Sequence, residues 1–216
     1  MTISTLVSML ADGMLTSSTI FALTLLGSLP LGLLVAFGRM SKSALVRVPV
    51  RIYISIMRGT PLMLQLMFVY FAPYYIFGIP LSPNYRFIAV MIAFIINYAA
   101  YFAEIYRGGL QAISPGQYEA AAVLGYSRLQ CFCKIIFPQF VKHILPPVTN
   151  EVITLVKDTS LAFVLSVSEM FTVAKAIAAA QKTMTAFIAA GVFYYVFNAV
   201  VAWIMELIEK RLAYFR

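Results

Sequence analysis

Two polar side chains lie inside long apolar stretches of this sequence, where burial costs them solvation. Asp158 lies in the stretch 148–167 and Asn97 in the stretch 86–106, and Ser160 follows Asp158 by two residues. Such residues in a membrane span are rare, and they face a cavity or a partner side chain. A carboxylate can accept from an ammonium, whereas an amide or hydroxyl can donate to a carboxylate or a side-chain amide. The chemistry that we expect is therefore hydrogen bonding or ion pairing with a small polar solute or with a partner side chain.

A purely structural role would explain Asp158 equally well. Its carboxylate could pair with Arg58, or with Lys157 of a second copy of the chain, and so hold helices together. Neighbouring residues on a helix point about 100° apart, so Asp158 and Lys157 of one chain cannot both face one partner. Both roles remain open at this point.

The elements that must position these residues are membrane-spanning helices. Of the 216 residues, 62% are hydrophobic, and the mean hydropathy is +0.90. A bilayer core needs about 20 helical residues to cross it. We expect an all-α integral membrane protein with a single transmembrane domain over residues 1–216, and an interfacial helix over residues 1–13. The five predicted spans cover residues 16–37, 52–71, 86–106, 148–167 and 185–208.

Basic residues give an orientation to these spans. The net charge is +8, and the basic residues gather after the first, third and fifth spans. The positive-inside rule explains this better than binding to nucleic acid, and it predicts an N-terminus outside and a C-terminus in the cytoplasm. Glu104 and Arg107, three residues apart at the end of the third span, are close enough to pair, either as an interfacial ion pair or as a gating contact.

The segment 107–146 between the third and fourth spans is polar and predicts two short helices. Ser114 can cap the first helix, with Gln117 completing a capping box, and Gly125 can end it. Ser127 and Gln130 repeat the same signal for a second helix. That helix should stop near Pro138, because proline lacks the amide hydrogen that a helix requires.

The spacing of residues in this segment is similar to that of a known loop. Glu119-Ala120-Ala121, then Gly125, then Ile135, Phe137 and Pro138 resemble the cytoplasmic EAA loop of permease subunits of ATP-binding cassette (ABC) importers, with Phe137 in a leucine position. In that family the loop couples to the ATPase subunit. The resemblance implies that Glu119, Ala120, Ala121, Gly125 and Arg128 make this contact.

Further segments resemble the permeases of polar amino acid importers, such as those for glutamine, histidine, arginine or cystine. They are Arg58-Gly59-Thr60-Pro61 with Gln65, the stretch 103–109, and the stretch 157–161. The resemblance implies a multi-pass protein of a bacterial cell membrane that pairs with a second copy or a close homologue. It also implies two ABC ATPase subunits that hold ATP and Mg, an extracytoplasmic amino-acid-binding protein, and alternating access. No cofactor is implied in this chain.

Within such an importer, Asp158 would meet the ammonium of the amino acid, and Asn97 or Ser160 its carboxylate or side-chain amide. One turn beyond Asp158 stands Ala162 rather than a second acid. A substrate with two positive groups favours two carboxylates, so the sequence favours a neutral or disulfide-bearing amino acid.

Two other classes of protein fit the sequence less well than an ABC permease does. An ion-coupled secondary transporter of small polar solutes would need internal symmetry or broken helices, and no internal repeat is visible. An intramembrane enzyme acting on lipid would use Asp158 and His143, but His143 lies in the predicted loop, whereas Asp158 lies about ten helical residues into the fourth span, a distance of about 15 Å along a helix. With no phosphate-binding glycine loop, metal-ligand cluster or nucleophile beside a base, we expect neither catalytic residues nor a metal site in this chain. Any ATP hydrolysis belongs to a partner.

Overall fold

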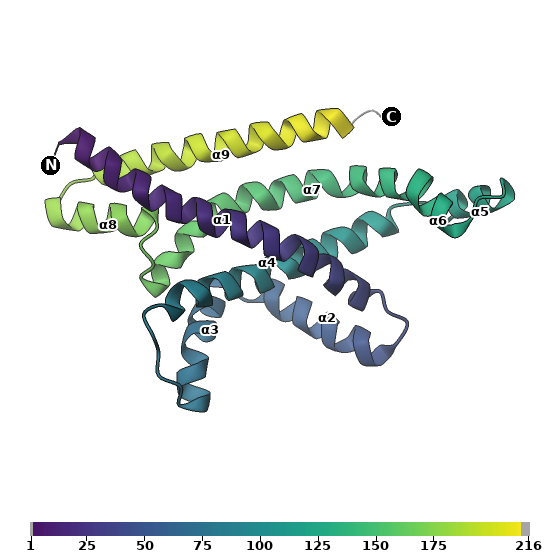
Figure 1. Ribbon diagram of the computed structural model, residues 1–216, viewed down its shortest axis with the longest axis horizontal. Coiled ribbons are helices and arrows are strands. Elements are labelled where there is room, and N and C mark those ends of the chain that lie inside the picture. The colour runs from purple at the N-terminus through teal and green to yellow at the C-terminus, as the bar shows by residue number, and fades with distance from the viewer. Residues whose placement is uncertain (1, 213–216) are drawn as a thin grey trace.

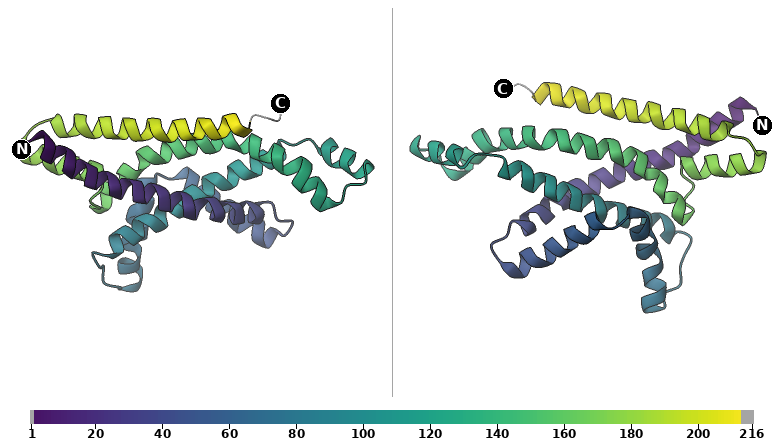
Figure 2. Two further views of the ribbon diagram at one scale, coloured as in Figure 1. Left: turned by 45° about the horizontal axis from the view of Figure 1, so that its top comes forward. Right: turned by 180° about the vertical axis from the view of Figure 1, so that it is seen from behind.

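The computed structural model describes residues 2–212, and within them it is all-helical (Figure 1). Long helices run roughly side by side, and the shorter α2 and α3 splay from one side of this bundle (Figure 2). The α-helices are α1 (Ile3–Arg39), α2 (Ala44–Gly59), α3 (Leu62–Phe77), α4 (Tyr85–Gln111), α5 (Pro115–Val123), α6 (Arg128–Cys131), α7 (Phe137–Asp158), α8 (Met170–Gln181) and α9 (Thr185–Leu212). A π-helical turn, η1 (Phe132–Ile136), precedes α7, and a 3₁₀ helix, η2 (Thr159–Leu165), follows it.

The core forms where α1 crosses α4. The buried face of α1 carries small residues at helical spacing, among them Thr24, Ser28 and Gly32. A Cβ atom built on Gly32 would lie 2.8 Å from the Cβ of Phe102, so only glycine allows this close approach of the two helices. Small residues at such crossings are typical of membrane helix packing, which depends on van der Waals contact.

The N-terminal turns of α1 pack in a second cluster with α8 and α9, so the prediction of a separate interfacial helix over residues 1–13 is wrong. Helix α1 runs without interruption from Ile3, and Leu6 and Leu10 are buried against α8. Gly13 lies so close to the backbone of Met170 that an added Cβ would be 2.8 Å from its Cα. The first turns are therefore anchored by packing that a hydropathy profile cannot show.

The predicted second span is broken. Helices α2 and α3 meet at Gly59–Pro61 with a bend of 114°, because glycine loosens the helix and proline lacks the amide hydrogen to continue it. The predicted fourth span is also bent: α7 tightens into η2 after Asp158, and α8 follows at 58°. Irregular backbone at membrane depth is tolerated where protein buries it or where it lines a cavity.

The loop after α4 confirms one predicted break and corrects another. Gly125 has φ +79° and ends α5, as predicted. The capping box at Ser127 and Gln130 is present. The side chain of Ser114 instead accepts from the amide of Gly116, and Gln117 contacts Ser114 through its backbone amide, which donates to the Ser114 carbonyl at 3.0 Å, so the predicted box is not formed there. The predicted stop near Pro138 is wrong, because the chain continues helically from α6 through η1 into α7.

The physical reason is the wide π turn in front of Pro138. Phe137 donates its amide to the carbonyl of Phe132, five residues earlier, and this spacing gives the proline ring room that a regular α-turn denies it. The side chain of Gln139 donates to the carbonyl of Ile135 at 2.9 Å and so replaces part of the lost backbone bonding.

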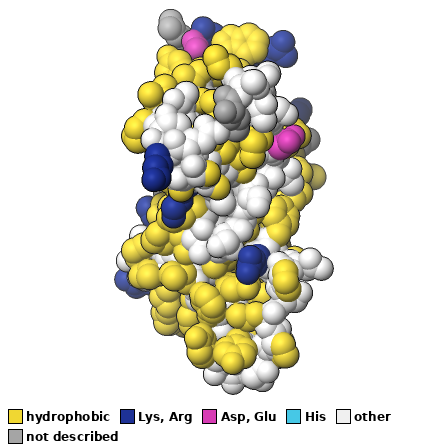
Figure 3. Space-filling view, turned by 90° about the vertical axis from the view of Figure 1, so that its left-hand side faces the viewer, with side chains coloured by type: hydrophobic (Ala, Val, Ile, Leu, Met, Phe, Trp, Pro, Cys, Tyr) yellow, Lys and Arg dark blue, Asp and Glu magenta, His cyan; other side chains and the backbone are white. Residues whose placement is uncertain are grey.

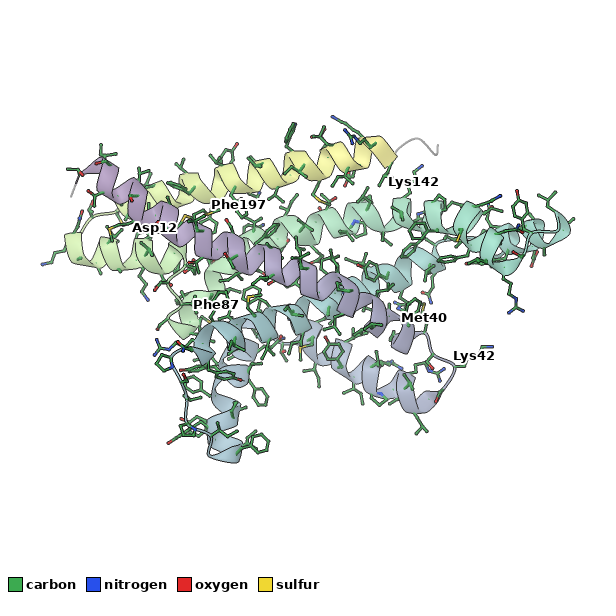
Figure 4. The ribbon with its side chains drawn as sticks, viewed as in Figure 1. Asp12, Met40, Lys42, Phe87, Lys142 and Phe197 are labelled. Carbon is green, nitrogen blue, oxygen red and sulfur yellow. The ribbon has the colours of Figure 1, made fainter. Side chains whose placement is uncertain are left out.

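Three of the described helices, α1, α4 and α9, are long and apolar enough to cross a membrane, and the two bent pairs raise the count to five if each crosses once. Seen from the N-terminal end, apolar side chains cover most of the surface, with isolated charged groups between them (Figure 3). Asp12 lies toward this end, whereas Met40, Lys42 and Lys142 lie toward the opposite one (Figure 4). The basic ends of α1 and α4 meet there through ion pairs of Glu104 with Arg39 and Arg107.

Candidate functional site

A polar cavity of about 370 Å³ lies between the α2–α3 bend, the middle of α4, and the end of α7. It lies beside two interruptions of regular α-helix, namely the α2–α3 bend and the change from α7 to η2 after Asp158. A larger groove of about 450 Å³ lies between α7 and α9, but of its two acidic residues Glu206 is paired with Lys210 and Glu209 accepts from the hydroxyl of Thr149, and none of the predicted substrate residues lines it. The polar cavity is lined by Thr60, Pro61, Leu62, Asn97, Tyr98, Tyr101, Glu151, Thr154, Asp158 and Leu161.

Asp158 lies in this cavity and is held by α4. The hydroxyl of Tyr98 donates to Asp158 Oδ2 at 2.8 Å. None of the ion pairs found among residues 2–212 involves Asp158. Arg58, one of the partners that a structural role would use, instead has its guanidinium 5.3 Å from the centre of the Tyr101 ring. Within this chain the carboxylate is therefore not neutralised by an ion pair.

Glu151 is a second acid in the same cavity, and the sequence analysis did not single it out. It precedes Asp158 by seven residues, which is two helical turns, so both carboxylates lie on one face of α7. Thr154 lies between them on that face. The premise that Asp158 stands without a second acid is therefore wrong, because the second acid lies two turns before Asp158 rather than one turn after it. The seven-residue spacing is the signal that would have found Glu151.

Asn97 and Ser160 are placed differently from each other. Asn97 lines the cavity, but its amide nitrogen donates to the carbonyl of Met57 at 3.1 Å and to Gln65 Oε1 at 2.9 Å. Ser160 is not among the lining residues, and its hydroxyl donates to the carbonyl of Lys157 at 2.7 Å. The structure thus brings Asp158 and Asn97 together and leaves Ser160 outside the lining.

The predicted coupling residues lie on the α5–α6 loop, at the end of the molecule that carries Lys142 (Figure 4). Glu119, Ala120 and Arg128 are exposed, whereas Ala121 is 1% exposed and packs into the core of its own chain. Beside them, three large apolar side chains project into solvent. These side chains, which we call the loop tip, are Val123 (88% exposed), Leu124 (73%) and Leu129 (72%).

The chain thus has a polar cavity beside a broken span and an exposed helical loop at one end. Both features are compared with those of known proteins through the family and the relatives that the chain resembles. The sequence model of the family described as "Binding-protein-dependent transport system inner membrane component" matches residues 28–214. The chain belongs to this family. The permease is 38% identical to the probable amino-acid ABC transporter permease protein YckA of Bacillus subtilis, over 86% of this chain and 80% of that protein.

Other relatives of the permease carry the same kind of description. It is 37% identical to the octopine transport system permease protein OccM of Rhizobium radiobacter, over 84% of this chain and 78% of that one. It is 33% identical to the glutamine transport system permease protein GlnP of Escherichia coli, over 95% and 94% of the two chains. The resemblance seen in the sequence is thus confirmed.

Solved structures agree on the fold of the permease. A chain of the crystal structure of an amino acid ABC transporter with histidines superposes with a TM-score of 0.87 at 29% identity, covering 98% of this chain and 100% of that chain. A chain of the methionine ABC transporter MetNI in an inward-facing conformation gives a TM-score of 0.68 at 16% identity, over 98% and 99% of the two chains. The latter shows a shared fold alone.

Proposed function

We propose that this permease is the transmembrane subunit of an ATP-driven ABC importer that moves a polar L-amino acid into the cytoplasm. The observation that carries the proposal is the cavity with Glu151 and Asp158 on one face of α7, inside an otherwise apolar bundle. Ionisable residues in a membrane span are expensive, and they mark substrate or ion pathways. The names of the relatives, which include an octopine and a glutamine permease, agree with an amino acid as cargo.

The charges in and beside the cavity favour an amino acid with a cationic side chain. Two carboxylates can take two positive groups, namely the α-ammonium and a side-chain cation, while Asp158 keeps its hydrogen bond from Tyr98. Arg58, stacked on the lining residue Tyr101, supplies a guanidinium for the substrate carboxylate. Asn97 lines the wall of the cavity, while its amide nitrogen donates to Met57 and Gln65. Ser160 would need a different rotamer to reach a ligand, because its hydroxyl is engaged by Lys157.

Alternating access has a physical basis in the two bends of the chain. The α2–α3 bend of 114° borders the cavity, whereas the bend of 58° lies between Leu165 and Met170, just beyond the last lining residue, Leu161. Short segments joined at a bend can rotate as rigid bodies, which is how many transporters open one side at a time. We infer that a second copy or a close homologue completes the pathway, because one chain shows no internal repeat.

The loop within residues 107–146 supplies the coupling to the ATPase. Its exposed surface combines Glu119 and Arg128 with the apolar loop tip, and its helices are fixed by the cap at Ser127 and by the turn at Gly125. Exposed apolar side chains rimmed by charges are typical of protein interfaces. A rigid helical pair can transmit a rigid-body motion, whereas a flexible loop cannot.

The proposed roles of the cavity and the loop imply an orientation of the importer in the membrane. The basic ends of α1, α4 and α9 lie in the cytoplasm and the N-terminus lies outside, in a bacterial cell membrane that the five spans cross. ATP and Mg are held by two ATPase subunits below the loop tip. An extracytoplasmic amino-acid-binding protein delivers the cargo on the opposite side.

The proposal is tested by purifying the tagged permease from its native membrane and reconstituting whatever copurifies into liposomes. We expect an ATPase subunit to copurify, and ATP-dependent uptake of labelled arginine or histidine once the binding protein is added. Glu151→Gln should lower the uptake of arginine more than that of glutamine, because the second carboxylate is needed only for a second cation. Uptake that follows a proton or sodium gradient without an ATPase would instead indicate a secondary transporter.

A further inference from the structure

We propose that Gln65 and Asn97 are positioning residues that hold the α2–α3 bend against α4 and thereby fix one wall of the cavity. We refer to the two side chains as the amide clamp. The inference rests on the proposed function insofar as the cavity binds the transported solute. It goes beyond that function by assigning a role to two side chains that need not touch the solute at all.

The clamp replaces a hydrogen bond that Pro61 removes. In a continuous helix, the carbonyl of Met57 would accept from the amide of residue 61, four positions later, but proline has no amide hydrogen. Two side-chain amides donate to this carbonyl instead, Gln65 Nε2 at 3.0 Å and Asn97 Nδ2 at 3.1 Å. Asn97 comes from α4, so the missing backbone bond becomes a link between two spans.

The same two side chains also fasten the bend to itself. The two hydrogens of Gln65 Nε2 are shared among three acceptors, because the carbonyl and the hydroxyl of Thr60 lie 3.1 Å and 2.8 Å from this nitrogen in addition to the carbonyl of Met57. Gln65 Oε1 accepts from Asn97 Nδ2 at 2.9 Å. Gln65 is 8% exposed and Asn97 is 4% exposed, so water has little access to these bonds. An unpaired carbonyl at membrane depth is unfavourable because lipid offers it no donor, and this keeps the network closed.

The location of the clamp gives it a consequence for binding. Thr60, Pro61 and Leu62 form the wall of the cavity opposite Asp158 and Glu151, and Asn97 lines the cavity from α4. Releasing the clamp frees the corner at Pro61 to move away from α4, which widens the cavity and weakens the contacts of a bound solute with both carboxylates. The clamp therefore sets affinity, whereas the loop tip sets coupling to the ATPase.

The experiment uses variants that keep shape and remove donors. Asn97→Asp and Gln65→Glu are prepared in the assembled, reconstituted transporter, and Asn198→Asp makes the same change in α9, which lines no part of this cavity. Hydrogen exchange of the backbone over residues 56–66 reports on the bend without reference to any substrate. Uptake of labelled arginine gives the half-saturating concentration and the maximal rate.

We expect faster exchange over residues 56–66 in both clamp variants but not in Asn198→Asp. We also expect the half-saturating concentration to rise by about tenfold, the loss expected for buried hydrogen bonds, with a smaller change in maximal rate. Unchanged exchange would overturn the clamp itself, and it would do so even if no amino acid were taken up. Faster exchange with an unchanged half-saturating concentration would overturn its role in positioning the wall.

A second variant separates the clamp from a general loss of folding. Pro61→Ala restores an amide hydrogen at position 61. If the clamp replaces this hydrogen, Asn97→Asp should raise the half-saturating concentration less in the Pro61→Ala background than alone, by about twofold rather than about tenfold. Equal effects in the two backgrounds would contradict the inference.

Discussion

The hydroxyl of Tyr98 donates to Asp158 Oδ2 at 2.8 Å, which joins the middle of α4 to the last residue of α7. Tyr98 itself is 2% exposed, so its ring is fixed by the core and the hydroxyl has little freedom to turn away. The carboxylate is thus oriented at the cavity wall by a neutral donor and keeps its charge available for a cationic group.

Removing this donor should weaken solute binding without disturbing assembly. Hydrogen bonds to charged groups contribute about 1.5–3 kcal/mol, so Tyr98→Phe is expected to raise the half-saturating concentration by about tenfold or more. Asp158→Asn should abolish most uptake, because the acceptor charge is lost. Both are measured as ATP-dependent uptake in proteoliposomes, with copurification of the ATPase as the control. If Asp158→Asn prevented assembly, the aspartate would be structural.

Two adjacent glycines of α4 provide a matched test of the packing between α4 and α7. A Cβ built on Gly109 would lie 2.2 Å from Ile144 Cγ2, whereas one on Gly108 would meet nothing within 4 Å. Gly109→Ala should destabilise the permease by about 1–3 kcal/mol through overpacking. Gly108→Ala should be neutral or stabilise it by up to about 1 kcal/mol through helix propensity. Thermal unfolding in detergent compares the two, and equal midpoints would show that α7 can shift to make room.

Much of this fold could be predicted because bilayers impose length and charge rules on single segments. The apolar stretches over α1, α4 and α9 and the breaks at Gly59, Pro61 and Gly125 follow from local properties. The continuous start of α1 does not, because it depends on contact with Met170 in a distant helix. The passage through Pro138 does not either, since a π turn upstream accommodates a residue that normally stops a helix.

In the candidate site, too, some residues could be identified from the local sequence, whereas others depend on contacts between distant helices. Asp158 and Asn97 could be identified because each interrupts an apolar run, and the structure places both in one cavity. Glu151 does not interrupt an apolar run, because it lies near the polar beginning of the stretch 148–167, two turns before Asp158, and the sequence alone therefore did not identify it. The engagement of Asn97 by Met57 and Gln65 could not be predicted, because it depends on how α2 and α4 meet at the bend.

The left-handed turn of the loop should govern coupling rather than stability of the membrane bundle. Gly125 has φ +79°, a region that costs other L-residues about 1–2 kcal/mol. Gly125→Val should therefore distort the loop tip, reducing ATPase copurification and stimulated ATP hydrolysis while thermal unfolding of the permease changes little. Gly116→Ala is the control, because its added Cβ would meet its nearest atom, Ser114 Oγ, at an ordinary 3.5 Å. Intact coupling in Gly125→Val would show that the turn is not part of the ATPase contact.

The ion pairs of Glu104 should stabilise the basic ends of α1 and α4 because they are sheltered. The predicted pair of Glu104 with Arg107 is present at 2.6 Å, and Arg39 joins it from α1 at 3.4 Å. The side chain of Glu104 is 15% exposed, whereas Glu206, paired with Lys210 at 2.6 Å on α9, is 58% exposed. Exposed pairs contribute about 0–1 kcal/mol, and sheltered ones gain more from the lower local dielectric.

A double-mutant cycle of Glu104→Gln and Arg39→Gln should therefore give a coupling free energy of about 1 kcal/mol or more in thermal or denaturant unfolding. Glu206→Gln and Lys210→Gln should couple by less than about 0.5 kcal/mol, because water screens both groups. The cycle also separates an ion pair that fastens two helices from a gating contact. A fastening pair lowers stability and leaves the ratio of transport to ATP hydrolysis unchanged when it is broken. A gating pair would raise ATP hydrolysis without transport in Glu104→Gln.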